Sequence, residues 1–173
     1  MTTVPLTKLE KILPLAQAAK RLGLSEGTLR RLVNSGKVRA AVLPGGEIGV
    51  GEQSAARVAS YEQINEQLRS IHRRNFVALR GKPITIAEAA EKYDILERTL
   101  REWVKRELVV VLEDGYGKKL DEGDVAYCAK VYHVRRTGKS LSGAPLLDEN
   151  GNPNLLKHPQ LSEYRRKKNE FAG

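Results

Sequence analysis

One stretch of this sequence occurs twice, and the internal repeat constrains the fold more than any other feature. Residues 15–35, LAQAAKRLGLSEGTLRRLVNS, align without a gap on residues 86–106, IAEAAEKYDILERTLREWVKR, at a constant offset of 71 positions. Eight aligned positions are identical, including Ala18, Thr28 and Arg30. A repeat of this kind indicates one structural unit used more than once. The chain is therefore expected to contain two copies of one small domain.

Each copy predicts two short helices joined by a tight turn. The small Ala18 and Ala19 fall where the first helix must let the second approach closely. Gly23 accepts the positive φ of a helix C-cap, and Ser25 supplies a side-chain oxygen for the next N-cap. The second helix repeats apolar residues at three- and four-residue steps, which gives it one apolar face. Those apolar residues are Leu29, Leu32 and Val33.

The outer face of the second helix carries polar and basic side chains in both copies. Arg and Asn on such a face can hydrogen-bond base edges in a major groove, and nearby cations can neutralise phosphates. In the first copy, the expected DNA contacts are Ser25, Glu26, Thr28, Arg30, Arg31 and Asn34, with Lys20, Arg21, Lys37 and Arg39 on phosphate. In the second copy and its extension, they are Glu97, Arg98, Thr99, Arg101, Lys105, Arg106, Arg135 and Arg136.

The first copy also resembles a known family. The segment AAKRLGLSEGTLRRLVNSGKVRAAVLPGG is similar to the winged helix-turn-helix of the excisionase-like and MerR-like DNA-binding domains. In that family the helix pair is followed by a Gly-Lys-apolar segment, then by a glycine-containing hairpin called the wing, and then by a further helix. Residues 36–38 and 43–46 fit this pattern. The resemblance implies a winged helix-turn-helix fold and sequence-specific binding to double-stranded DNA.

The second copy fits the same family pattern, with differences. Residues 108–112 and 114–117 correspond to a wing strand and its tip, and residues 120–125 to the start of the next helix. The offset falls to 70 there, so one residue is lost in the second wing. Asp94 and Leu96 replace the turn glycine and the N-cap serine, although Asp tolerates turns well. The first wing, GGEIGVG, has no basic residue, whereas wings of the family commonly carry Arg or Lys.

The expected fold class is mainly α with small β wings: two winged helix-turn-helix domains joined by a long helix, plus a C-terminal extension. The first domain is expected over residues 1–58 and the second over residues 84–134. Residues 59–83 form the helical linker and residues 135–173 the basic extension. The long helix is expected from Glu52 to about Leu79, because this stretch lacks Pro and internal Gly and is rich in helix formers.

An apolar stripe on this long helix leaves alternatives open. Tyr61, Ile64, Leu68 and Ile71 recur at three- and four-residue steps. The stripe either packs back on the first domain or forms a homodimer seam or a rigid spacer between the two domains. In the tail, a helix is expected from Gln160 to Phe171. The tail is either an arm that becomes ordered when it binds DNA or a protein partner, or it is a solvated terminus.

The charge of the chain points to an anionic partner. The net charge is +9 and the isoelectric point about 9.7, which favours nucleic acid over a membrane surface because no long amphipathic basic helix stands out. Residues 1–50 carry eight Lys/Arg and three Asp/Glu, whereas residues 81–134 carry nine and eleven. The first copy and the tail are therefore the electrostatic candidates for DNA.

The sequence does not predict an enzyme. The three histidines are dispersed, and no metal-ligand spacing or phosphate-binding glycine motif occurs, so neither metal nor cofactor is expected. The single cysteine, Cys128, and the single tryptophan, Trp103, lie in apolar patterns and are expected in the core. No apolar run is long enough to span a membrane and the first residues show no signal-peptide pattern, so a cytoplasmic location is expected.

The functional hypothesis is a sequence-specific binder of double-stranded DNA. It would act as a transcriptional regulator or as an excisionase-like accessory factor in DNA recombination of a phage or other mobile element. The alternative is a protein-interaction module, or a non-catalytic DNA-recognition subunit of a larger DNA-processing assembly such as a genome-packaging machine. In that case the second domain or the C-terminal tail would bind a protein partner.

Overall fold

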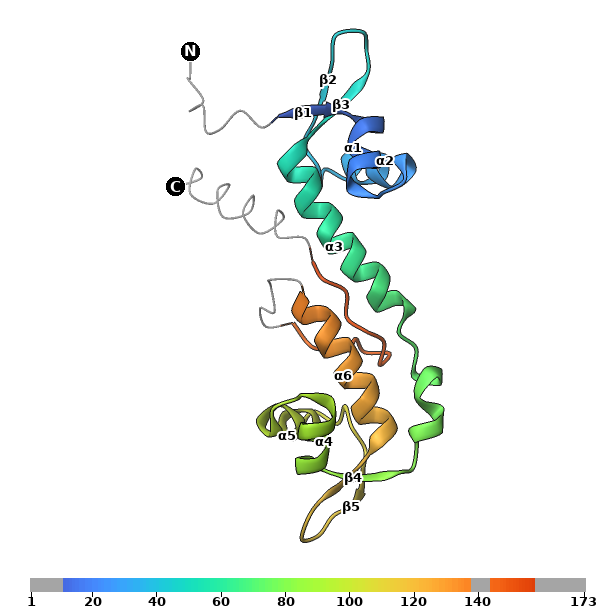
Figure 1. Cartoon of the computed structure of the whole chain (residues 1–173), viewed down its shortest axis with the longest axis vertical. Helices are drawn as coiled ribbons and strands as arrows, with labels where there is room; N and C mark the ends of the chain where they lie inside the picture. The colour runs from blue at the N-terminus through green and yellow to red at the C-terminus, as the bar shows by residue number, and fades with distance from the viewer. Residues whose placement is uncertain (1–10, 138–143, 158–173) are drawn as a thin grey trace. The chain divides into compact units, whose positions relative to one another are not determined.

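The computed structural model describes residues 11–137 and 144–157. It is mainly helical, with two small three-stranded antiparallel sheets, which confirms the predicted class at this level (Figure 1). The chain divides into two compact units, one built on residues up to 63 and the other on residues 64–156. No helix among the described residues is long and apolar enough to cross a membrane.

Repeat 1, residues 12–59, begins with a strand and a pair of helices. Gly23 ends the first helix in the left-handed conformation, at φ 65°, and Leu24 N donates to Ala19 O at 3.0 Å. The Ser25 side chain caps the second helix by accepting from Thr28 N at 3.1 Å. The expected turn and cap are therefore both present. The elements are β1 Ile12–Pro14, α1 Leu15–Leu22, α2 Glu26–Asn34, β2 Ala40–Val42, β3 Ile48–Gly51 and α3 Glu52–Ser70.

Repeat 2, residues 83–137, reproduces this order at the offset read from the sequence. Asp94 adopts the left-handed conformation at φ 51°, so it replaces Gly23 in the turn as predicted. Glu107 does the same at φ 56°, where repeat 1 has Gly36 at φ 69°. The elements are β4 Pro83–Thr85, α4 Ile86–Tyr93, α5 Glu97–Lys105, β5 Val111–Glu113, β6 Lys119–Asp121 and α6 Glu122–Thr137.

The residue lost from the second hairpin leaves a bulge. The sheet orders are β1-β3-β2 and β4-β6-β5, so the third strand is central in each. In repeat 1 Ala41 pairs with Gly49, but in repeat 2 the pairing passes from Val111 to Glu113 and leaves Leu112 irregular. Gly49 is the residue without an equivalent. A Cβ there would lie 2.6 Å from Ile12 Cγ2 and 2.9 Å from Leu43 Cγ, so any larger residue would have to displace these two side chains.

Equivalent positions form the core of each repeat. The first helix of each pair contributes alanines that let the helices approach, and the second contributes large apolar residues. Trp103 and Cys128 lie in the core of repeat 2, as predicted. The buried pairs are Leu13/Ile84, Ala18/Ala89, Leu29/Leu100, Leu32/Trp103, Val38/Val109, Val50/Leu120, Ala55/Val125, Val58/Cys128 and Ala59/Ala129.

The prediction of one helix from Glu52 to Leu79 is wrong. α3 ends at Ser70, and a separate 3₁₀ helix, η1, spans Arg73–Leu79. η1 lies beside α6 (Figure 1), where the Phe76 ring meets Tyr127 edge-to-face at 5.9 Å between centroids. These tertiary contacts override the helix propensity of the segment. Leu68 and Ile71 are buried, so the predicted dimer seam loses two members of its apolar stripe.

Residues 144–156 fold back within the second unit. The predicted turn at residues 148–151 is present, since Asp148 Oδ1 accepts from Asn150 N at 2.9 Å and Asn152 N at 2.8 Å. Tyr127 Oη donates to Gly151 O at 2.9 Å, and the buried Asn65 exchanges two hydrogen bonds with the backbone of Leu156. The expected helix from 160 to 171 lies outside the described residues.

Candidate nucleic-acid interface

α2 presents one continuous polar face to solvent. Leu29 and Leu32 bury the opposite face, and the Ser25 cap begins the helix at an exposed turn. Arg31 Nη2 and Ser25 Oγ both donate to Thr28 Oγ1, at 3.2 and 2.9 Å. The fully exposed residues form two adjacent rows at four-residue steps. These rows are Glu26, Arg30, Asn34 and Gly27, Arg31.

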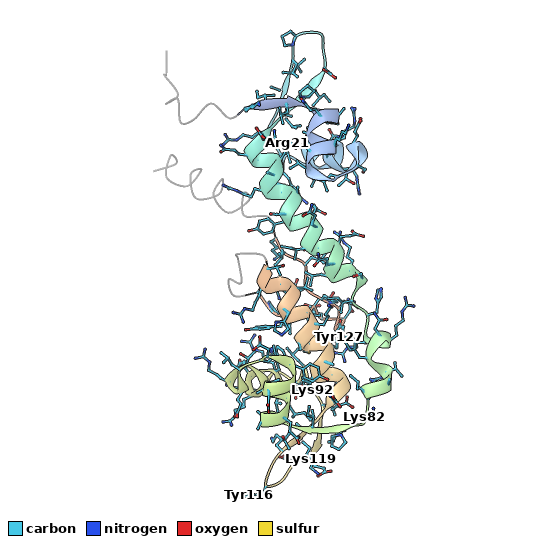
Figure 2. All side chains as sticks on the ribbon, viewed as in Figure 1. Arg21, Lys82, Lys92, Tyr116, Lys119 and Tyr127 are labelled. Carbon is cyan, nitrogen blue, oxygen red and sulfur yellow. The ribbon has the colours of Figure 1, made fainter. Side chains whose placement is uncertain are left out.

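Most cations around α2 are available to an anion. Arg30 makes no ion pair with any described residue, and neither do Lys20, Lys37 and Arg39. Arg21, labelled in Figure 2, lies in the last turn of α1, and its Nη1 contacts Glu52 Oε1 at 2.6 Å. Its side chain is 60% exposed, so this surface pair contributes little stability and can open toward a phosphate.

α5 presents the equivalent face in repeat 2, with more charge. Arg101 Nη2 contacts Glu97 Oε2 at 2.7 Å, and Arg106 Nε contacts Glu102 Oε1 at 2.8 Å. Arg98 and Lys105 are exposed and make no ion pair with any described residue. Thr99 is half-buried at the edge of the face, as Thr28 is in α2. The predicted contacts on α5 are therefore brought together on one surface.

The assignment of Arg135 as a DNA contact needs correction. Its side chain is buried, at 4% exposure, and Nη1 donates to Pro145 O at 2.5 Å. A guanidinium buried in this way cannot reach the backbone phosphates of a duplex lying on the surface of the unit. Arg136 is exposed and stacks over the Tyr132 ring, with 5.4 Å between its Cζ and the ring centroid.

The acidic residues at the start of α6 are structural, which the sequence analysis missed. Asp121, Glu122 and Asp124 are all buried. Asp121 accepts from three backbone N–H groups, and Asp124 Oδ1 accepts from Arg73 Nη1 at 2.7 Å. Carboxylates directly after a strand and within the first helical turn are typical of helix N-caps, and this was the available signal.

Glu122 joins α6 to α4. Its Oε1 accepts from Lys92 Nζ at 2.5 Å and from Tyr93 Oη at 2.8 Å. Figure 2 labels Lys92, together with the hairpin residues Tyr116 and Lys119. The hydrogen bond from Lys92 is the main cause that lowers the pKa of Glu122. Burial, reinforced by the hydrogen bond to Glu122, raises the pKa of the Tyr93 hydroxyl.

These buried acids change the electrostatic account of repeat 2. Three of the eleven acids in residues 81–134 belong to the interior, so the surface carries fewer negative charges than the count implies. The outer rows of α5 hold Arg98, Arg101 and Lys105 against Glu97 and Glu102, an excess of one cation. The outer rows of α2 hold the same excess. The charge count therefore understates the suitability of α5 for an anionic partner.

The described residues contain no group of three His, Cys, Asp or Glu side chains that could hold a metal ion. Cys128 is buried, and burial raises the pKa of its thiol to about 12.

Comparison of the chain with protein-family models, with curated proteins and with solved structures gave no match.

Proposed function

We propose that this chain is a sequence-specific double-stranded DNA-binding protein with two winged helix-turn-helix domains. α2 and α5 act as the recognition helices, and the β2–β3 and β5–β6 hairpins act as the wings. The protein serves as a transcriptional regulator or as an excisionase-like accessory factor in the recombination of a phage or other mobile element.

The exposed face of α2 is the observation that carries this proposal. It combines Arg30, which has no ion-pair partner among the described residues, with Asn34 one turn away. An Arg and an Asn on an exposed helix are the side chains that read guanine and adenine edges bidentately. Gly27 lies on the same face, and a Cβ there would meet only Ser25 Oγ at 4.0 Å. Packing does not require this glycine, whereas close approach of the helix to a groove favours it.

A binding titration on random-sequence duplex DNA, at two salt concentrations, tests the proposal. The variant Arg30→Glu/Arg31→Glu is compared with the wild type by fluorescence anisotropy. Each phosphate contact contributes a slope of about 0.9 in log affinity against log salt. If both arginines contact phosphate, the slope falls by about 1.8 and affinity at 0.1 M salt drops by at least about 60-fold.

Two charge-matched variants locate the effect. Arg101→Glu/Lys105→Glu tests α5, and Arg57→Glu/Arg74→Glu makes the same change in net charge at exposed positions outside both faces. Only changes on a recognition helix should lower the affinity for DNA by more than Arg57→Glu/Arg74→Glu does. Site selection from a random library then identifies the target sequence. Binding that survives Arg30→Glu/Arg31→Glu unchanged would refute the role of α2.

A second candidate function, docking of a protein partner on repeat 2, rests on its exposed apolar residues. Leu96 is 63% exposed where repeat 1 has the capping Ser25, and Val110 and Tyr116 are exposed as well. Exposed apolar side chains favour a protein contact where they form one contiguous patch. If α5 docks protein, Arg101→Glu/Lys105→Glu leaves DNA affinity unchanged and abolishes partner binding.

A further inference from the structure

The second unit contains a cavity of about 430 Å³ beside α5. It lies between α5, the end of α6 and the segment that follows residue 143. Its lining combines the apolar and aromatic residues Trp103, Tyr132 and Leu146 with three arginines, Arg98, Arg106 and Arg135. Cavities of this size bind small molecules when an apolar lining is combined with a few fixed polar groups.

Arg135 is the unusual member of this lining. It is 4% exposed, and its Nε has no hydrogen-bond partner among the described residues. Within the described part of the chain it makes one hydrogen bond, to the backbone carbonyl Pro145 O, and contacts no carboxylate. Burial without an acid lowers the pKa of the guanidinium. A buried charge with no counter-ion is costly, which makes it a natural receptor for an anion.

The charges around the cavity also favour an anion. Glu102 is the only acid among the described residues of the lining, and it pairs with Arg106 at 2.8 Å. Arg98 and Arg135 therefore remain without a carboxylate from the described residues. A carboxylate accepts two parallel hydrogen bonds from a guanidinium, so its geometry suits Arg better than a point charge does.

We propose that this cavity is a binding site for a small carboxylate with an apolar, preferably aromatic, body. The carboxylate lies against Arg135 and Arg98, and the apolar body packs on Trp103 and Leu146. Water at this place would satisfy Nε but would leave the buried charge uncompensated. The site goes beyond DNA binding and does not depend on it, although Arg98 belongs to both surfaces.

Trp103 provides a direct readout because it is the only tryptophan and lines the cavity. The full-length wild-type chain is titrated with benzoate while Trp103 fluorescence is recorded, without DNA. Benzyl alcohol serves as the neutral analogue, and N-acetyl-phenylalanine represents the C-terminal carboxylate of a peptide. We expect a saturable change with a Kd below about 1 mM for at least one carboxylate and none for the alcohol.

Three variants separate binding from folding. Arg135→Met removes the buried cation, and Arg98→Gln removes an exposed cation whose loss does not threaten the fold. Arg101→Gln is the matched control, since it is an exposed α5 arginine outside the lining. Arg135→Met and Arg98→Gln should weaken carboxylate binding at least tenfold, and Arg101→Gln should not.

Thermal melting gives an independent readout. Benzoate or N-acetyl-phenylalanine should raise the melting temperature of the wild type and of Arg101→Gln, but not that of Arg135→Met. The stronger ligand shows whether the site takes a free carboxylate or a peptide terminus. No saturable change with any carboxylate up to about 10 mM, or equal response to benzyl alcohol, overturns the proposal.

Discussion

Replacement of Asp121 tests whether the acids at the start of α6 hold the second unit together. Asp121 Oδ1 accepts from Gly123 N at 2.9 Å and Asp124 N at 3.2 Å, which caps α6. Oδ2 accepts from Gly81 N at 2.7 Å and so fixes the segment before β4. Loss of a helix cap costs about 1–2 kcal/mol, and loss of one further hydrogen bond about 1 kcal/mol. Asp121→Ala should therefore lower the free energy of unfolding by about 2–3 kcal/mol.

Asp121→Ser divides this loss into its two parts. Serine keeps the cap but is too short to reach Gly81, so we expect a loss of about 1 kcal/mol. Urea denaturation followed by Trp103 fluorescence reports on the second unit alone, because no other tryptophan is present. Asp114→Ala, an exposed acid in the β5–β6 hairpin, is the control and should stay within about 0.5 kcal/mol. If Asp121→Ala changes stability no more than this control, or Asp121→Ser is equally damaging, the reasoning fails.

Two further predictions concern single residues of repeat 2. The hydrogen bond from Lys92 is the main cause that lowers the pKa of Glu122 from 4.5. The ionised Glu122 therefore stabilises the fold above pH 4.5, and this stabilisation is lost as the pH falls through the folded-state pKa. Glu122→Gln should flatten this acid-induced loss in a pH series of urea melts; an unchanged profile would contradict the assignment. Glu107 adopts φ 56°, so Glu107→Gly should stabilise the second unit by about 0.5–1 kcal/mol in the same assay, and a loss of stability would contradict this reasoning.

The local features of the fold were predictable because short-range chemistry determines them. The offset of 71 relates α1 and α2 to α4 and α5 as the sequence predicted. Ser25 caps α2 and Asp94 forms the turn after α4, which are the roles that their side chains predict. The change of offset to 70 appears as the irregularity at Leu112. The buried positions of Trp103 and Cys128 followed from apolar spacing alone.

The features that the sequence did not reveal depend on contacts between distant residues. Helix formers continue past Ser70, but packing of Phe76 against Tyr127 replaces the α-helix with a 3₁₀ turn. Arg135 looked like part of a basic run, and only the fold of the following segment places Pro145 O within its reach. A count of charges likewise could not separate the buried carboxylate of Asp121 from those exposed on α5.

The two repeats share a core but differ in how closely their outer faces can approach another surface. Gly27 leaves backbone exposed in the first turn of α2, whereas the corresponding position in α5 is Arg98. A partner can therefore contact the backbone of α2 at this position, whereas in α5 a long side chain covers the equivalent backbone. If these two residues were exchanged, a partner could approach the backbone of α5 more closely and that of α2 less closely, while both cores would remain intact.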